Sequence, residues 1–116
     1  MHRDLELTKE WNAVCLLERI VPDTGVCALL NGRQVAVFRL GGDVPRVFAI
    51  DNYDPNADAA VLSRGLVGSI GERVVVASPI YKQHFDLQTG ECLEAPHNSV
   101  ASYPVRIEDG QVWVGA

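Results

Sequence analysis

The sequence predicts an all-β fold, because short runs of β-branched and aromatic residues recur along most of the chain and turn residues separate them. The pairs Asn31-Gly32 and Asp109-Gly110 each lie between apolar runs, which is the pattern of a tight hairpin. Helical spacing of apolar residues is weak and confined to the first twenty residues. An antiparallel sandwich or barrel fits these observations better than a fold of alternating strands and helices.

The first half of the chain predicts a hairpin followed by a third strand. Strands are expected at residues 26–30 and 34–40, because Asn31-Gly32 between them tolerates the positive φ angles of a tight turn. After a loop that contains Gly and Pro, residues 46–50 form another run typical of a strand. Residues 11–17 are compatible with either an opening strand or a short helix.

The second half predicts a long loop, a central strand and two further hairpins. Residues 51–71 carry Asn, Asp, Pro, Ser and Gly, and loops of that length in compact domains are usually functional. Residues 74–77 are apolar on both faces, as expected for a strand that is covered on both sides. A small hairpin is expected around Gly90, and a last one joins residues 102–107 to residues 111–114.

Composition and charge exclude several classes of protein. Apolar residues make up 47% and charged residues 22%, which is an ordinary globular balance. The formal charge is −5 without a basic cluster, so nucleic acid is not an expected partner. The longest apolar runs are far shorter than the roughly 20 residues that cross a bilayer, and the start of the chain lacks the features of an export signal. A single cytoplasmic domain of residues 1–116 is expected, with no membrane contact.

The cysteines predict neither a disulfide framework nor a metal site. Cys15, Cys27 and Cys92 are an odd number at wide spacings, and no Cys-x-x-Cys pair is present. Free cysteine packs as a small hydrophobic residue. All three are therefore predicted to be buried, reduced thiols.

Residues 78–90, Ser-Pro-Ile-Tyr-Lys-Gln-His-Phe-Asp-Leu-Gln-Thr-Gly, resemble the second cluster-binding loop of Rieske ferredoxins, which runs Cys-Pro-x-His, three residues, then Phe-Asp-Leu-x-Thr-Gly. Residues 48–56 resemble the strand and first loop of the same family. The resemblance implies a Rieske-like antiparallel β-sandwich or barrel. By position, the four cluster ligands are replaced by residues of other types, namely Asp54, Asn56, Ser78 and Tyr81.

Those replacements predict a fold without its cluster, because a Rieske centre needs two thiolates and two imidazoles. No cofactor is therefore expected in this chain, and none of its cysteines lies in either loop. A metal site supplies folding free energy when it is present, so the two loops must be held together in another way. We expect hydrogen bonds between their polar side chains to do this.

A narrower resemblance rests on residues 61–68, 77–85 and 103–106, which are similar to the small subunits of assimilatory NAD(P)H-dependent nitrite reductases. It implies a non-catalytic subunit that supports the assembly, stability or activity of a large subunit. That large subunit would carry FAD, siroheme and an iron–sulfur cluster and would reduce nitrite to ammonium. Nitrate assimilation in the cytoplasm is the implied setting.

Four residues are candidates for the surface that meets a partner: Arg64, Lys82, Gln83 and His84. Lys82 and Gln83 are expected at the exposed tip of the second loop, where they either contact a partner or are simply solvated. His84 is the single imidazole in the motif, and a metal site needs three or four converging ligands, so a surface or interface role is favoured. The sequence shows no pattern of His and acidic residues that would make Ser78 a catalytic nucleophile. His2 and His97 are expected to be ordinary surface residues.

Two rival functions stay open in the sequence. A free-standing, cluster-free scaffold or regulatory module for another reductase or oxygenase would have the same fold, because a fold alone does not determine function. A Rieske electron carrier would need the ligands that this chain lacks. The identity of the partner separates the first alternative from the nitrite reductase subunit.

Overall fold

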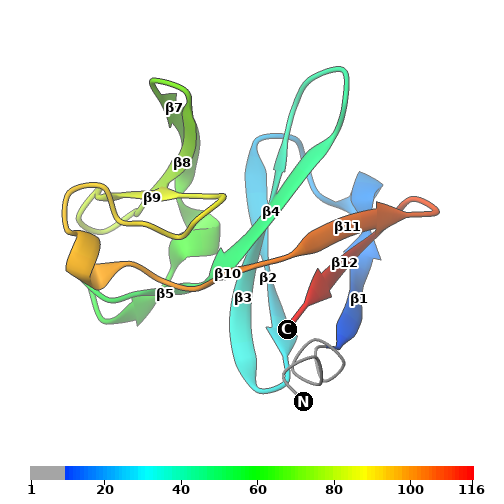
Figure 1. The fold of residues 1–116 in the computed structure, drawn as a ribbon, viewed down its shortest axis with the longest axis horizontal. Coiled ribbons are helices and arrows are strands. Elements are labelled where there is room, and N and C mark those ends of the chain that lie inside the picture. Colours follow the sequence, from blue (N-terminus) through cyan, green and yellow to red (C-terminus); the bar gives the residue numbers. More distant parts are fainter. Residues whose placement is uncertain (1–9) are drawn as a thin grey trace, which may run out of the picture.

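The computed structural model describes residues 10–116, and its strands form two lobes (Figure 1). The larger lobe contains β1 (Trp11–Leu16), β2 (Thr24–Leu30), β3 (Arg33–Leu40), β4 (Arg46–Asp51), β10 (Ser102–Tyr103), β11 (Val105–Glu108) and β12 (Gln111–Gly115). The smaller lobe contains β5 (Tyr53–Asp54), β6 (Ala59–Ala60), β7 (Leu66–Ile70), β8 (Arg73–Ala77) and β9 (His84–Asp86). Short 3₁₀ turns connect them: η1 (Leu17–Arg19), η2 (Leu62–Arg64) and η3 (Pro96–Asn98). The predicted all-β antiparallel architecture is confirmed.

Two sheets form the larger lobe, in the orders β11–β12–β1 and β2–β3–β4–β10. The predicted hairpin between β2 and β3 is confirmed, since Asn31 (φ 52°) and Gly32 (φ 81°) form the turn and Leu30 pairs with Arg33. The opening segment is a strand and not a helix, because β1 pairs with β12 through a bulge between Ala13 and Cys15. No helix within residues 10–116 has the length and hydropathy to span a membrane.

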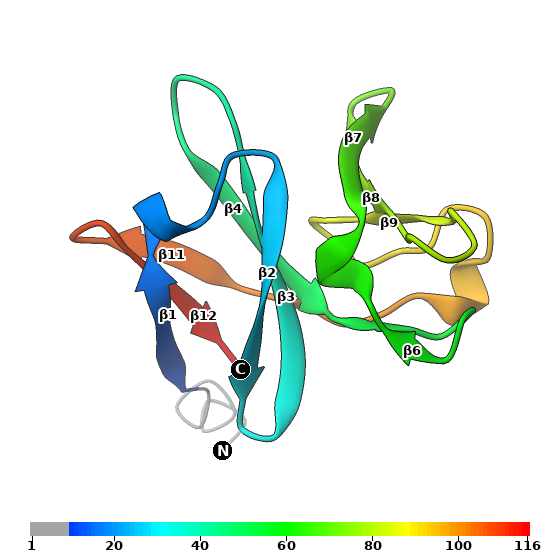
Figure 2. The ribbon, with the colours of Figure 1, turned by 180° about the vertical axis from the view of Figure 1, so that it is seen from behind.

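Strand β3 lies between the other strands of the larger lobe and the smaller lobe (Figure 2). Its side chains belong to two hydrophobic cores. Its odd-numbered residues Val35 and Val37 pack between the two sheets of the larger lobe. Its even-numbered residues Ala36, Phe38 and Leu40 pack against the smaller lobe. Successive side chains of a strand point to opposite faces, so one strand contributes to both cores and ties the lobes together.

The prediction of an unbroken loop over residues 51–71 is wrong, because β5, β6, η2 and β7 lie within it. β7 pairs with β8 from Leu66 opposite Ala77 to Ile70 opposite Arg73. The small residues Gly68 and Ser69 hide its strand character in the sequence, and pairing with β8 supplies the hydrogen bonds that make it a strand. β8 lies at the centre of the sheet β7–β8–β9, as predicted.

One further expectation about the strands is corrected by the structure. Residues 102–107 are not one strand, because Pro104 divides them: Tyr103 pairs with Ala49 of β4, whereas Val105 pairs with Val114 of β12. Proline has no N–H for the ladder, so the chain changes sheet at that residue.

The cysteines are all free, as predicted, but only Cys92 is fully buried. Cys27 is exposed because β2 is an edge strand and its side chains alternate between the core and the outside. Cys15 is half-buried. Partial desolvation by neighbouring atoms raises the pKa of both the Cys15 and the Cys27 thiol, which keeps each of them protonated at neutral pH.

Candidate functional site

Two loops of the smaller lobe meet at a buried polar contact. The first loop, residues 52–58, carries Asp54, and the second loop, residues 78–83, begins at Ser78. Ser78 Oγ donates a hydrogen bond of 2.5 Å to Asp54 Oδ2, and both residues are fully buried. Asp54 Oδ1 accepts the backbone N–H of Asn56 at 2.9 Å. The predicted hydrogen bonding between the loops is confirmed.

The side chain of Asn56 extends this contact to a third segment. Its Oδ1 accepts a hydrogen bond of 2.7 Å from Asn98 Nδ2, on the turn η3, and its Nδ2 lies 3.7 Å from Cys92 Sγ. Asn98 and Cys92 were not predicted as part of the site. They lie 42 and 36 residues from Asn56, and no local pattern in the sequence indicates such pairings.

The second loop is closed by its own backbone. The N–H of Ser78 donates to Gln83 O at 2.9 Å, and the N–H of Lys82 donates to Ser78 O at 3.0 Å. Lys82 adopts a left-handed conformation (φ 65°), which a non-glycine residue adopts at some cost and which lets the loop turn back. Tyr81 therefore lies at the tip with 63% of its surface exposed, and its neighbour Ile80 is 45% exposed. Within the described residues, Tyr81 takes no part in the contact between the loops.

The four candidate interface residues lie in different environments. Arg64 and Lys82 are exposed, but the placement of Gln83 at the exposed tip is wrong. Gln83 is half-buried because its carbonyl closes the loop, and its Oε1 is buried without a hydrogen-bond partner among residues 10–116. Arg64 begins the segment that packs on β8, since a Cβ added to Gly65 would lie 2.3 Å from Ala77 O.

His84 is held by an acidic residue that the sequence did not indicate. Glu94 accepts the backbone N–H of His84 through Oε1 at 2.7 Å, and its Oε2 lies 2.6 Å from His84 Nδ1. Burial opposes ionisation of Glu94, but the hydrogen bonds from the backbone and ring of His84 outweigh it and hold the pKa of Glu94 below its usual value. The ring nitrogen Nδ1 of His84 is therefore already paired with the Glu94 carboxylate.

Asp86, in the Phe-Asp-Leu segment of the motif, anchors the hairpin that follows the second loop. Its Oδ1 accepts the backbone N–H groups of Gln88 and Thr89 at 2.7 and 2.9 Å, and its Oδ2 accepts Arg73 Nε at 2.8 Å. Burial opposes its ionisation, but these hydrogen bonds together hold the pKa of Asp86 below its usual value. Gly90 ends the turn at φ 84°, where an added Cβ would lie 2.0 Å from Val100 O.

The lowered pKa of Asp86 predicts acid sensitivity. A carboxyl group whose folded-state pKa is depressed stabilises the fold above its unfolded pKa of about 4, and this stabilisation is lost as pH falls through the folded-state pKa. We expect urea unfolding to show a loss of stability as the pH falls below about 4. The Asp86→Asn variant is expected to be less stable than the unmodified chain at pH 7. It should also lose less stability than the unmodified chain when the pH is lowered.

The control for this experiment is Glu72→Gln, which changes an exposed carboxylate in the turn before β8. It should keep the acid sensitivity of the unmodified chain. If Asp86→Asn loses as much stability on acidification as the unmodified chain does, Asp86 is not its source.

The family model described as Rieske-like [2Fe-2S] domain matches residues 10–115. The chain belongs to this family. The Rieske-like chain is 47% identical over 103 residues to the nitrite reductase (NADH) small subunit of Salmonella typhimurium, with 89% of this chain and 94% of that protein covered. It superposes on the NMR structure of the Escherichia coli protein NirD with a TM-score of 0.86 and 43% identity, covering 94% of this chain and 98% of that one.

A third relative is much longer. The nitrite reductase [NAD(P)H] large subunit of Klebsiella oxytoca is 42% identical to this chain over 108 residues, which are 93% of the chain but 11% of that protein. The chain therefore spans about a tenth of the length of this relative. A stretch similar to the whole Rieske-like fold is part of a larger polypeptide there.

The residues present do not fit the iron–sulfur cluster that the family description names. Such a cluster needs soft thiolate ligands and imidazoles. Between the two loops lies a direct hydrogen bond from a serine to an aspartate, both fully buried. Two cysteines lie near the first loop, Cys92 beside Asn56 and Cys27 beside Asn52, but neither takes part in the contact between the loops. Among residues 10–116, no group of three or more His, Cys, Asp and Glu side chains is placed to hold a metal ion.

Proposed function

We propose that this chain is the non-catalytic small subunit of a cytoplasmic NAD(P)H-dependent nitrite reductase that reduces nitrite to ammonium. The observation that carries the proposal is the buried Ser78–Asp54 hydrogen bond between the two loops that, by their resemblance to Rieske ferredoxins, would hold a cluster. A chain without a redox centre in this fold supports another subunit instead of passing electrons itself. The small-subunit relatives, which match over most of their length, point to which subunit that is.

The proposed partner is a nitrite reductase large subunit that carries FAD, siroheme and an iron–sulfur cluster. Support comes from the Klebsiella oxytoca large subunit, in which a stretch similar to this chain is covalently part of the large polypeptide. Domains that are joined in one relative are good candidates for association when they are separate chains. We further propose that residues 1–116 act as one domain, because β3 supplies side chains to both cores.

The surface that we propose for this association is the tip of the second loop, residues 80–82, together with the adjoining Gln83 and His84. It also includes Arg64, on the segment that packs against β8. Ile80 and Tyr81 are exposed apolar residues beside the cation Lys82, and exposed aromatic residues are frequent anchors of protein interfaces. The Ser78–Asp54 hydrogen bond and the backbone closure of the loop hold this tip in one shape before binding. Pre-organisation of this kind lowers the entropic cost of association.

The experiment is a pull-down of the tagged chain from nitrate-grown cells, with absorption spectroscopy and NADH-dependent nitrite reduction assayed on the partner. A partner with flavin and siroheme spectra supports the proposal. Recovery of an unrelated reductase or oxygenase would favour a scaffold or regulatory module, and an iron–sulfur spectrum in the tagged chain itself would contradict the proposal.

Variants of the tip test the surface. Tyr81→Ser combined with Lys82→Glu is expected to weaken binding to the large subunit at least about tenfold, which corresponds to about 1.4 kcal/mol. The matched control is Val44→Ser, an exposed apolar residue on the larger lobe, which should bind as the unmodified chain does. Equal binding by the tip variant and the control would exclude the tip as the interface.

A further inference from the structure

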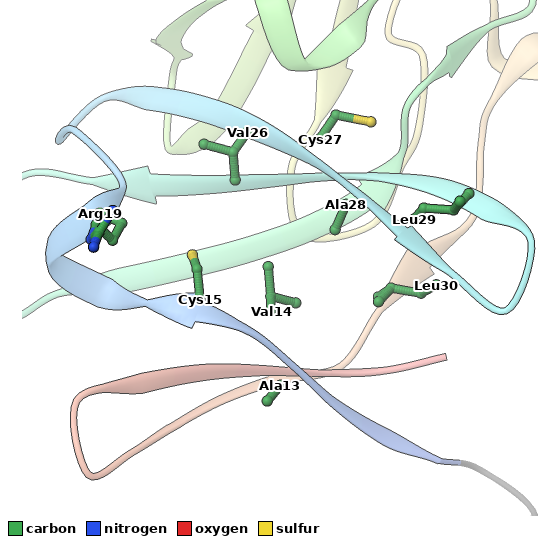
Figure 3. A pocket seen from close by; sticks show the side chains of 9 residues that line it. All are labelled: Ala13, Val14, Cys15, Arg19, Val26, Cys27, Ala28, Leu29 and Leu30. Carbon is green, nitrogen blue, oxygen red and sulfur yellow. The ribbon is translucent and has the colours of Figure 1, made fainter.

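The larger lobe has an open seam between β1 and β2. β1 pairs only with β12, and β2 pairs only with β3, so the outer edges of both strands are free within the described chain. They border the same open pocket of about 370 Å³. Figure 3 shows that Val14 and Cys15 of β1 and Val26 and Ala28 of β2 point into this space, whereas Cys27 points away from it.

The free edge of β2 presents unused backbone groups. The two-residue turn makes Leu30 and Arg33 a hydrogen-bonded pair, so Ala28 and Val26 also bond to β3. The N–H and C=O groups of the intervening residues Cys27 and Leu29 therefore point outward. No backbone group of these two residues is hydrogen-bonded elsewhere in residues 10–116.

This edge lacks the features that usually protect an exposed strand. Native proteins shield edges with charged residues, proline or bulges. β11 carries Arg106 and Glu108 and follows a proline, but β2 contains no charged residue and no proline, and 71% of the surface of Leu29 is exposed. An unprotected edge beside an apolar pocket is the arrangement to which an extended peptide adds as a further strand.

We propose that the seam binds an extended segment of the large subunit, which pairs with the outer edge of β2. This inference rests on the proposed function, which supplies the partner. Alternate side chains of the segment would enter the apolar pocket, and an acidic side chain would meet Arg19, the one charged residue among the described residues that line it. The Klebsiella oxytoca relative, in which a similar stretch belongs to the large-subunit polypeptide, favours this occupant over a second copy of the chain.

Amide hydrogen exchange of the full-length chain, alone and bound to the purified large subunit, tests this proposal. The amides of Cys27 and Leu29 are expected to exchange at least tenfold more slowly in the complex. Leu29→Lys is expected to weaken binding about tenfold without changing the thermal midpoint of the free chain, since Leu29 is largely exposed. Val44→Lys, at an exposed apolar residue in the loop between β3 and β4, is the matched control and should bind normally.

The outcomes separate the two proposals. If the large subunit binds but the amide exchange rates of Cys27 and Leu29 do not change, the proposal that the seam is the binding site is overturned. The proposed function is not affected by that result. Absence of any binding would overturn both. Slower exchange of these amides in the free chain as its concentration rises would show that a second copy occupies the seam, which also overturns this proposal.

Discussion

Replacing Ser78 by alanine is expected to lower the free energy of unfolding by about 3 kcal/mol. The substitution removes the O–H that donates to Asp54 Oδ2 and leaves that oxygen buried without a partner. An unsatisfied buried polar group costs more than the net value of the hydrogen bond, because it has lost its hydration without compensation. Urea unfolding of the purified variant measures the loss.

The matched control is Ser69→Ala, which removes the hydroxyl of an exposed serine on β7 and should change stability by less than about 0.5 kcal/mol. A double-mutant cycle with Asp54→Ala tests whether the two side chains act together. The effects of removing two groups that share one hydrogen bond are not additive. The double variant should therefore lose less unfolding free energy than the sum of the losses of the two single variants. Additive losses would mean that the Ser78–Asp54 contact is not what holds the loops.

Replacing Phe38 by alanine is expected to cost about 3–5 kcal/mol, the range for removal of a buried aromatic ring. Phe38 is fully buried in the core that joins β3 to the smaller lobe. Its ring also fills the space above Gly25, where an added Cβ would lie 2.6 Å from Phe38 Cε2. The surrounding strands cannot close the resulting cavity without disturbing β2 and β3.

The position of Phe38 also predicts which strands lose protection against amide exchange in the Phe38→Ala variant. Amide exchange in β8, which packs on the same core, should accelerate more than exchange in β12, which packs on the core of the larger lobe. Phe38→Leu keeps most of the apolar volume and is expected to cost less. A loss below about 1.5 kcal/mol for Phe38→Ala would show that the two lobes do not depend on this side chain.

Much of the fold could be predicted from the sequence because its signals are local. Asn31-Gly32 and Asp109-Gly110 turn the chain at positive φ angles, and the structure places a hairpin at both pairs. The strand β7 was missed because Gly68 and Ser69 have low strand propensity and depend on β8 for their pairing. The apolar run around Pro104 predicts one strand, but the missing N–H of proline ends β10 there and the chain changes sheet.

Most of the strands and the chemistry at the loop positions could be predicted from residue types alone, since Asp54 and Ser78 offer no soft ligand to iron. Which of these groups meet depends on the packing of segments that are far apart in the chain. Ser78 and Asp54 are 24 residues apart, and Asn56 reaches Asn98 across 42 residues. Contacts over such separations follow from how the two cores pack around β3. Local sequence patterns encode backbone angles and buried faces, but not these long-range pairings.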